Sequence, residues 1–381
     1  MKNPDAIVIG AGVVGAACAL ELSRAGMKVL VLDRGSIASG TTGSGEGNIL
    51  VSDKEVGPEL DLALRSRNKW FEIADEIGNE FELEPKGGIV VAKSNQGLSS
   101  LKILVEAQKH AGVIADEVDR EELHDLEPYL SHEFESGILY SQDAQCQPMM
   151  AAAQMLKWAK NRGAHLEVGA KVISIESDSQ GVSSVFTEKE TYYSRIVINA
   201  AGTWAGEIAA LAGSKLPISP RKGFILVTHP APNVVRHKVY DADYVANVAS
   251  GEADLQSSAV VEGTRSGTIL IGASRERVGF DSSLNISVLR ILAAQAIEIF
   301  PVLAQIPLLR AYHGFRPYAP DHVPVIGEDA RLKGLWHCAG HEGAGIGLAP
   351  ASADIIAAQI LGNSTFMDAT PFSPRRFELV K

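Results

Sequence analysis

The stretch IVIGAGVVGAACALELSRAGMKVLVLDR, residues 7–34, determines the fold of the N-terminal part of the chain. It begins with a short apolar run rich in β-branched residues, which is typical of a buried strand. A helix-like segment follows and ends at Gly26, and a second apolar run, KVLVLD at residues 28–33, closes the stretch. This order predicts the first strand, helix and strand of a doubly wound α/β sheet.

Three glycines, Gly10, Gly12 and Gly15, occupy the turn between the first strand and the helix. Glycines at this spacing allow a tight turn, let a pyrophosphate approach the backbone, and let the helix pack closely on the strand. The helix N-terminus then offers free amides and the positive end of its dipole to the phosphates. Asp33 ends the second strand, where an acid accepts hydrogen bonds from a ribose. The pattern predicts a dinucleotide site, but it does not by itself separate NAD from FAD.

Length and composition are those of a soluble globular protein. At 381 residues the chain is long for one compact core, so we expect two interleaved domains. The formal net charge of −11, without a clustered basic face, argues against nucleic-acid binding. The three cysteines, Cys18, Cys146 and Cys338, show neither metal-ligand spacing nor a disulfide framework. We therefore expect no metal site and a reducing, cytoplasmic environment.

The sequence predicts no transmembrane segment, because no uninterrupted apolar run reaches the roughly 18 residues that a membrane span requires. The run Ala6–Leu20 has the length of the apolar part of a signal peptide. Its glycines, however, have the spacing of the dinucleotide-binding turn, which favours that interpretation over export. The sequence is also compatible with peripheral association with a membrane.

Two kinds of pattern alternate along the rest of the chain. The start, the middle and the end combine buried strands, glycine turns and helices, whereas the two stretches between them are richer in strands. The sequence therefore predicts a doubly wound, Rossmann-like α/β domain interleaved with a sheet-rich α+β substrate domain. We expect the first domain to comprise residues 1–80, 140–215 and 312–381, and the second to comprise residues 81–139 and 216–311.

A second glycine-rich segment, CAGHEGAGIG at residues 338–347, precedes an apolar helix-like stretch near the C-terminus. A nicotinamide dinucleotide does not need a second glycine-rich helix start from the far end of the chain. FAD is longer, and its flavin gains negative charge on reduction, which a helix N-terminus would stabilise. The segment therefore favours FAD over NAD, with a simple glycine turn before a helix as the alternative interpretation.

Four motifs, in their order along the chain, resemble the FAD-dependent D-amino-acid oxidase superfamily in the branch of glycine oxidase and sarcosine oxidase. They are GAGVVG (10–15), NAAGTW (199–204), HGFRPYAPDHVPVIG (313–327) and GHEGAGIGLAPASA (340–353). The resemblance implies interleaved FAD and substrate domains. The loop TTGSGEGNILVSDK (41–54) is most similar to β subunits of D-hydroxyproline dehydrogenases, proline dehydrogenase complexes and opine oxidases. That similarity implies companion subunits with iron–sulfur or additional flavin centres, and an electron carrier as acceptor.

The resemblance also implies roles for individual residues. Arg316 is expected to pair with the substrate carboxylate, since a planar guanidinium offers two parallel charge-assisted bonds; a structural ion pair is the alternative. Tyr244 is expected to hold the same carboxylate, unless it is an ordinary half-buried sheet tyrosine. Glu46 and Asn48 lie in the loop that the family places by the flavin. They are expected to adjust the properties of the flavin ring or to contact the substrate; the alternative is that they only form hydrogen bonds with the backbone of the turn. The full set of expected FAD-binding residues is Gly10, Gly12, Val14, Gly15, Asp33, Arg34, Thr41, Thr42, Glu46, Gly47, Asn48, Val172, Ala201, Gly202, Trp204, Gly340, His341, Gly343, Gly345 and Ile346.

Together these features predict an FAD-dependent enzyme that oxidises the C–N bond of a small secondary amino acid, such as hydroxyproline, proline, sarcosine or an opine. Hydride transfer from the α-carbon of the neutral amine to flavin N5 would yield an imine. A dehydrogenase is favoured because no counterpart is recognisable for the lysine that activates oxygen in family oxidases. The alternatives are a glycine or D-amino-acid oxidase that uses O2, and a flavin-binding subunit that transfers electrons without its own turnover.

Overall fold

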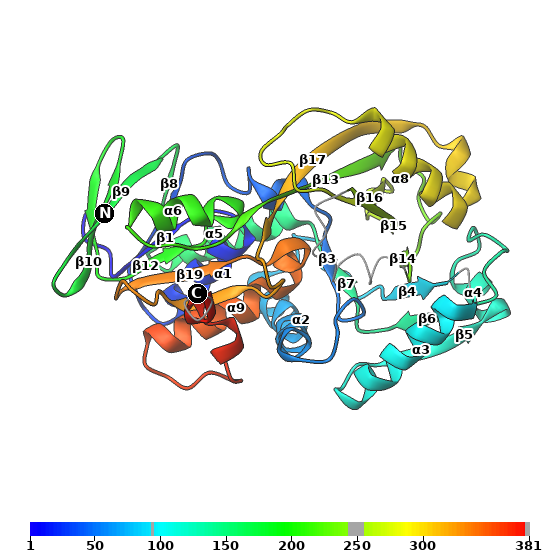
Figure 1. The fold of residues 1–381 in the computed structure, drawn as a ribbon, viewed down its shortest axis with the longest axis horizontal. Helices are drawn as coiled ribbons and strands as arrows, with labels where there is room; N and C mark the ends of the chain where they lie inside the picture. Colours follow the sequence, from blue (N-terminus) through cyan, green and yellow to red (C-terminus); the bar gives the residue numbers. More distant parts are fainter. Residues whose placement is uncertain (93–94, 243–254, 378–381) are drawn as a thin grey trace.

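The structure is a computed structural model of the chain, and it describes residues 1–92, 95–242 and 255–377. Two large β-sheets lie next to each other along the long axis of the molecule, each with its own set of helices (Figure 1). The N-terminus and the C-terminal segment both lie in the half that contains the first sheet. The first sheet supplies the parallel strand ends, and the second sheet supplies the wall that faces them.

The first sheet is mainly parallel. Its six strands, in order across the sheet, are β18 (Val325–Glu328), β19 (Leu335–Ala339), β12 (Val197–Asn199), β1 (Ala6–Ile9), β2 (Val29–Asp33) and β8 (His165–Val168). The neighbouring pairs from β19 to β8 are all parallel, and only β18 runs antiparallel, beside β19. The predicted mixed α/β fold with a doubly wound dinucleotide-binding sheet is thereby confirmed.

A layer of helices covers one face of this sheet. The helix predicted after the first glycine turn is α1 (Val13–Arg24), which follows β1 and packs against it and β2. The second glycine segment leads into α9 (Gly345–Ile360), which packs against α1 although it comes from the far end of the chain. Helix α5 (Pro148–Asn161) also packs against α1, and α2 (Pro58–Ile77) packs on α9 and α5.

The opposite face of the first sheet packs on a small antiparallel sheet and a short helix. Along β1, Ala6 and Val8 belong to the core on the helix side, whereas Ile7 and Ile9 belong to the core on the other side. Burial on both faces explains why this strand is apolar without alternation. The elements on this side are β9 (Val172–Asp178), β10 (Gly181–Thr187), β11 (Thr191–Tyr193) and α6 (Ala205–Leu211).

The second sheet is mostly antiparallel, and within the described residues only β14 and β4 pair in parallel. Its eight strands, in order, are β17 (Leu308–Tyr318), β13 (Ser219–Thr228), β16 (Ile269–Arg275), β15 (Gln256–Gly263), β14 (Lys238–Asp241), β4 (Gly88–Val91), β6 (Ser136–Tyr140) and β5 (Ala115–Asp119). The domain limits remain a prediction. The expected boundary between residues 311 and 312 falls inside β17, which continues in this sheet to Tyr318.

The two faces of the second sheet differ in character. Val239, Val261 and Ile271 belong to an apolar core that α8 (Ile286–Ile299) completes on one side. Lys238 and Glu262 are neighbours on β14 and β15, and both are buried on the sheet.

The remaining elements of the described residues are α3 (Asn95–His110), α4 (Arg120–Leu126), the paired β3 (Asn48–Ile49) and β7 (Ala144–Gln145), and the short 3-10 helices η1 (Thr41–Ser44), η2 (Gly202–Trp204), η3 (Pro301–Gln305), η4 (Glu342–Ala344), η5 (Thr370–Phe372) and η6 (Pro374–Phe377).

The segment Glu342–Ile360 is the one helical stretch of the described chain that is long and apolar enough to span a membrane. Of its most apolar window, 61% is buried inside the protein, and α9 packs against α1 and α2. Packing in the core therefore accounts for its apolar character.

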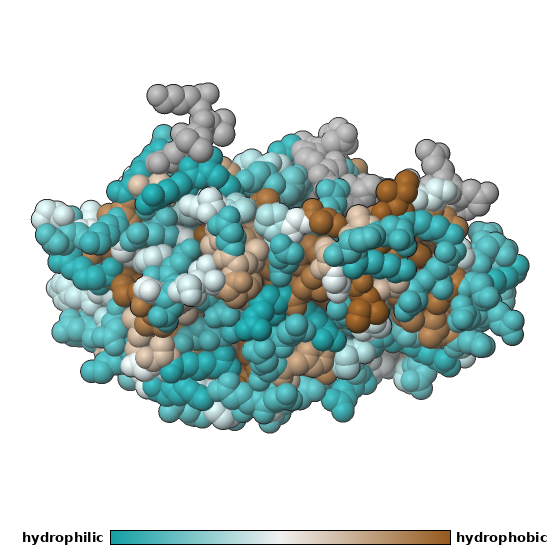
Figure 2. Space-filling model, turned by 90° about the horizontal axis from the view of Figure 1, so that it is seen from below, coloured by the Kyte–Doolittle hydropathy of each residue, from teal (hydrophilic) through white to brown (hydrophobic). Residues whose placement is uncertain are grey.

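The face in Figure 2 is mostly hydrophilic, and its more strongly hydrophobic patches lie on the half that contains the eight-stranded sheet.

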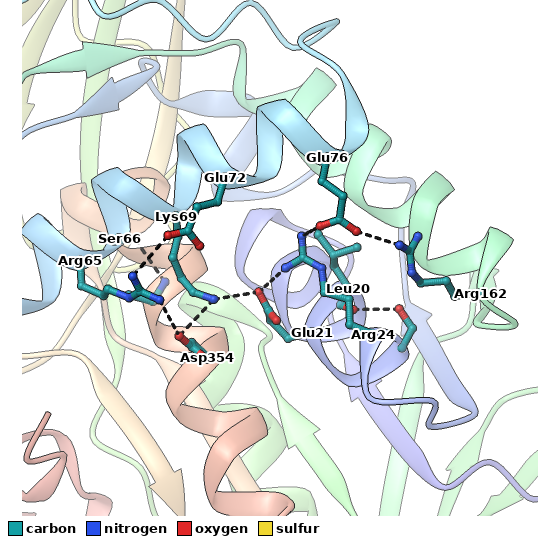
Figure 3. A network of polar contacts seen from close by, with 12 residues as sticks. Leu20, Glu21, Arg24, Arg65, Ser66, Lys69, Glu72, Glu76, Arg162 and Asp354 are labelled. Atoms are coloured by element: carbon teal, nitrogen blue, oxygen red, sulfur yellow. Dashed lines mark hydrogen bonds and ion pairs between the residues drawn. The ribbon is translucent and has the colours of Figure 1, made fainter. Parts of the chain in front are cut away.

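An ion-pair network joins α2 to the helices around it (Figure 3). Lys69 of α2 lies 3.3 Å from a carboxylate oxygen of Glu21 on α1 and 3.0 Å from one of Asp354 on α9. Glu76, near the C-terminal end of α2, has a carboxylate oxygen 2.7 Å from the guanidinium of Arg162, which follows α5. The Lys69 side chain is only 9% exposed, so its two contacts are poorly screened by solvent. Lys69 thus holds α9, and with it the second glycine segment, against α1.

We expect Lys69→Met to lower the free energy of unfolding by about 2 kcal/mol, because it leaves two partly buried carboxylates without their shared cation. Arg65→Met is the matched control, because Arg65 also contacts Asp354 but its side chain is 38% exposed; its effect should be below about 1 kcal/mol. Urea unfolding monitored by circular dichroism measures both. Equal effects of the two variants would contradict the assigned role of Lys69.

Candidate active site

A cavity of about 490 Å³ lies between the two sheets. Its walls include the carboxyl ends of β1, β2, β12 and β19 on one side, and residues of β13 and β17 on the other. In doubly wound sheets, ligands bind at the carboxyl ends of the strands. Gly12 of the first glycine segment and Gly343 and Gly345 of the second all line this cavity. The two segments therefore contribute to one site.

Most residues that the sequence predicts to bind the cofactor line this cavity: Gly10, Gly12, Val14, Asp33, Arg34, Thr41, Thr42, Glu46, Asn48, Val172, Ala201, Gly202, Trp204, His341, Gly343, Gly345 and Ile346. Gly15, Gly47 and Gly340 do not line it. A Cβ atom on Gly15 would lie 1.9 Å from the carbonyl oxygen of Gly10, and one on Gly340 would lie 2.8 Å from Ile218 Cδ1. A Cβ atom on Gly47 would similarly meet the Cys146 carbonyl at 1.9 Å. These three glycines allow the walls to pack closely without facing the cavity.

The N-terminus of α1 lies in the cavity wall. Its N-cap, Gly12, offers no side-chain cap, and the first turn carries no acidic residue. Thr42 Oγ1, from a distant loop, accepts a 3.0 Å hydrogen bond from Val13 N. Asp33 Oδ2 accepts a 2.7 Å bond from Ala11 N, so the acid that ends β2 is held against the glycine turn. Amides and an uncompensated helix dipole at this point suit a phosphate group.

Two aromatic residues of the cavity wall, Trp204 and Phe315, belong to a larger aromatic cluster. The Arg34 guanidinium carbon lies 4.1 Å from the ring centroid of Trp204, which stacks on Phe280 at 5.5 Å between centroids. Phe280 also meets the edge of Phe315 at 5.2 Å. Phe280 comes from the connection between β16 and α8; it is exposed and does not itself line the cavity, but it packs against Trp204 and Phe315, which do. Sequence reasoning missed it, because an isolated aromatic residue in a loop carries no periodic or motif signal.

The start of α9 also lies in the cavity wall. Like α1, this helix has no side-chain cap and no acidic residue in its first turn. His341 precedes it, is buried, and has Nε2 at 3.0 Å from Ser352 Oγ. Because Ser352 donates its hydroxyl proton to the carbonyl of Leu348, His341 Nε2–H is the donor to Ser352. Burial lowers the pKa of His341 to about 4, so the imidazole is neutral at physiological pH.

Arg316 lies in the cavity wall on β17. Its Nη1 donates a 2.8 Å hydrogen bond to the carbonyl oxygen of Ser274 on β16. A Cβ atom on Gly223 of β13 would lie 2.1 Å from that nitrogen, and one on Gly343 would lie 3.6 Å from Nε. The guanidinium therefore fits in a slot between two glycines, of which the sequence analysis missed Gly223. Tyr244, the second residue predicted to bind a carboxylate, lies outside the described residues, and its role stays a prediction.

Glu46 and Asn48 lie together in the same wall. Asn48 Nδ2 donates a 3.0 Å hydrogen bond to Glu46 Oε2, and the pairing of β3 with β7 holds Asn48 in position. Burial is the main cause that raises the pKa of Glu46, and the negative charge of Glu262 acts in the same direction. Lys238 and Arg316 lower it, but less than burial raises it. The site thus contains a buried acid that binds a proton more tightly than an exposed glutamate does.

Comparison with known proteins identifies relatives along almost the whole chain. The family model DAO, described as FAD dependent oxidoreductase, matches residues 5–359. Hydrogen cyanide synthase subunit HcnC of Pseudomonas aeruginosa is 28% identical over 99% of this chain and 97% of its own length. Glycine oxidase of Geobacillus kaustophilus is 27% identical over 98% of this chain and 97% of its own length.

Solved structures give the same result. The crystal structure of glycine oxidase from Geobacillus kaustophilus superposes with a TM-score of 0.90 at 25% identity, covering 99% of both chains. The crystal structure of L-proline dehydrogenase from P. horikoshii superposes with a TM-score of 0.90 at 26% identity, covering 99% of this chain and 98% of that chain. The fold, with both of its sheets, is therefore shared with these enzymes.

The buried neutral imidazole of His341 makes stability depend on pH in a defined direction. Its folded pKa of about 4 lies below the unfolded value of about 6.5, so unfolding takes up a proton between these values. The stability that His341 contributes is therefore present above pH 6.5 and is lost as the pH falls toward 4, at about 1.4 kcal/mol per pH unit.

Urea unfolding of wild type and His341→Gln between pH 7 and pH 4 tests this prediction. The wild type should lose its stability advantage over the variant as the pH falls. Asp143, whose pKa burial raises to about 6, acts in the opposite direction in both proteins, so the difference between them isolates His341. A difference that does not change with pH would mean that His341 is not the buried neutral group described here.

Proposed function

The chain belongs to the FAD dependent oxidoreductase family, and we propose that it oxidises the C–N bond of a small amino acid in the cavity between its two sheets. The favoured substrate class is a secondary amino acid such as proline, hydroxyproline, sarcosine or an opine. The observation that carries the proposal is the position of Arg316 in the cavity wall, in a slot between Gly223 and Gly343 at the second glycine segment. Relatives named glycine oxidase and L-proline dehydrogenase support the substrate class.

The walls of the cavity fit FAD. We assign the pyrophosphate to the N-terminus of α1, and the adenosine ribose to Asp33 with Arg34 beside it. The flavin end then lies at the start of α9, where a second uncapped helix N-terminus would stabilise negative charge. When bound, FAD supplies the two-electron acceptor for the hydride of the substrate. The loop from Thr41 to Asn48 would hold the middle of the cofactor, through those of its residues that line the cavity: Thr41, Thr42, Ser44, Gly45, Glu46 and Asn48.

The role of Arg316 in this proposal is to orient the substrate. Its hydrogen bond to Ser274 O holds the guanidinium in the wall, and the two flanking glycines leave the space that it occupies. A carboxylate that binds this planar group by two parallel bonds loses most of its rotational freedom, which fixes the α-carbon relative to the cofactor. Orientation is the main contribution expected from the protein, because the redox chemistry belongs to FAD.

For the second half of the reaction we propose a dehydrogenase that passes electrons to an iron–sulfur or flavin companion subunit and on to a carrier. HcnC, a relative along the whole chain, is itself named as a subunit, which supports a partner protein. The second candidate is an oxidase that uses O2, and the similarity to glycine oxidase in both sequence and fold favours it. We place either form in the cytoplasm, with peripheral membrane association as an alternative.

An anaerobic visible spectrum of the purified protein tests the proposed function. We expect oxidised-flavin bands that bleach on addition of one compound from the set D-hydroxyproline, proline, sarcosine, glycine and octopine. Slow return of the colour in air would indicate a dehydrogenase, and fast return an oxidase. A yellow protein that none of these compounds bleaches would contradict the proposal and favour a flavin subunit without its own turnover.

Substitution of the guanidinium tests how the substrate is held. We expect Arg316→Lys to raise the Kd or KM of the active compound by about tenfold or more, because a point charge cannot replace two parallel bonds. FAD content should not change. Arg310→Lys is the matched control, since Arg310 lies on the same strand but is exposed and stacks over Tyr312 at 5.4 Å. Unchanged kinetics in Arg316→Lys would remove this residue from the substrate site.

A further inference from the structure

The Glu46 carboxylate has an oxygen that the fold leaves without a partner. Glu46 is 9% exposed and lines the cavity. Its Oε2 accepts the hydrogen bond from Asn48, whereas Oε1 has no hydrogen-bond partner among the described residues. Behind it, a Cβ atom on Gly272 of β16 would lie 2.3 Å from Oε1, so only a glycine leaves room for the carboxylate. A buried acceptor with no donor is unfavourable unless a ligand supplies one.

Buried charged groups of both signs lie around Glu46. Lys238 Nζ on β14 lies 4.0 Å from Glu262 Oε2 on β15, and both side chains are almost fully buried. Glu262 Oε1 accepts a 3.2 Å hydrogen bond from Gly47 N, so this pair lies directly beneath the loop that carries Glu46. Lys238 therefore lies near both buried carboxylates, and Lys86 is a second cation near Glu262. On β17, Arg316 and Tyr312 face the same group, and Arg316 is assigned above to a substrate carboxylate.

We propose that Glu46 recognises the amino group of the substrate: its Oε1 binds the substrate nitrogen while Arg316 binds the carboxylate. This inference rests on the proposed function, because it assumes an amino-acid substrate in the cavity. A zwitterionic amino acid brings one negative and one positive charge to a site with an arginine and an unpaired carboxylate in the same wall. Hydroxy acids and simple carboxylates carry no cation and should bind weakly.

Glu46 also accepts one proton from the substrate. An N–H bond of the ammonium breaks, an O–H bond forms on Oε1, and the products are a neutral amine and a carboxylic acid, with no change in oxidation state. The nitrogen lone pair that this step releases is the one needed to form the C=N bond. Proton transfer is most efficient when donor and acceptor have similar pKa values. The raised pKa of Glu46 lies closer to the pKa of an ammonium donor than the pKa of an exposed glutamate does.

The test compares the holoenzyme of wild type, Glu46→Gln and Glu262→Gln. Flavin difference spectra give the Kd of tetrahydrofuran-2-carboxylate, the oxygen analogue of proline, and the concentration dependence of the rate of anaerobic flavin reduction gives the Kd of proline. The rate of anaerobic flavin reduction is measured from pH 5 to pH 10. Glu46→Gln keeps the volume and the contact with Asn48 but removes the charge. Glu262→Gln removes a carboxylate from the same cluster that does not line the cavity.

We expect wild type to prefer proline over the oxygen analogue by about tenfold or more, and Glu46→Gln to reduce this preference to less than about threefold. In Glu46→Gln the acid limb should move to higher pH, because the substrate ammonium must then lose its proton to solvent before hydride transfer. In Glu262→Gln the preference should remain and the acid limb should move to lower pH, because loss of a neighbouring negative charge lowers the pKa of Glu46. A merely structural role for Glu46 would not produce opposite changes in these two profiles.

A Glu46→Gln protein that keeps FAD, the preference and the wild-type profile would overturn the inference while leaving the proposed function intact. Failure of proline and the other amino acids to bleach the wild-type flavin would overturn both. If Glu46→Gln does not retain FAD, wild type alone decides: the Kd of proline should rise as the pH falls, whereas the Kd of the oxygen analogue should not. Parallel pH dependence of the two Kd values would overturn the inference.

Discussion

The close contact between α1 and β1 at Gly10 and Gly15 is the constraint on which the site depends. A Cβ atom on Gly15 would lie 1.9 Å from the Gly10 carbonyl, and one on Gly10 would lie 2.4 Å from the carbonyl of Ala200. Only a backbone without side chains here lets the helix N-terminus reach the strand ends. Because α9 packs against α1, the same contact also fixes where the second helix N-terminus faces the cavity.

The local parts of this arrangement could be predicted from the sequence, since they depend on residues close together in the chain. The β1–α1–β2 unit, the glycine segments and the alternation of two sheets all follow from spacing and periodicity. Arg316 was singled out through a family resemblance. Gly223 and Phe280 could not be found in this way, because each matters only through a contact with an element distant in sequence. Gly47 and Glu262, which meet across 215 positions, illustrate the same limit.

The two sheets contribute different kinds of group to the site. The parallel sheet presents helix N-termini and glycine turns, which suit the phosphates and the flavin of a long cofactor. The antiparallel sheet presents charged side chains on rigid strands, with Arg316 on β17 and Glu262 and Lys238 beneath the loop of Glu46. A substrate between them would therefore meet a redox group on one side and fixed charges on the other. This division explains why the chain crosses between the two sheets more than once.

The most direct measurement is a crystal structure of the oxidised protein with tetrahydrofuran-2-carboxylate, which has no amine to oxidise. The account predicts FAD along the cavity with its flavin end at the start of α9. It also predicts the carboxylate of the analogue within hydrogen-bond distance of the Arg316 guanidinium. A flavin located elsewhere, or a carboxylate bound away from Arg316, would contradict the claim that the cavity between the two sheets holds both cofactor and amino acid.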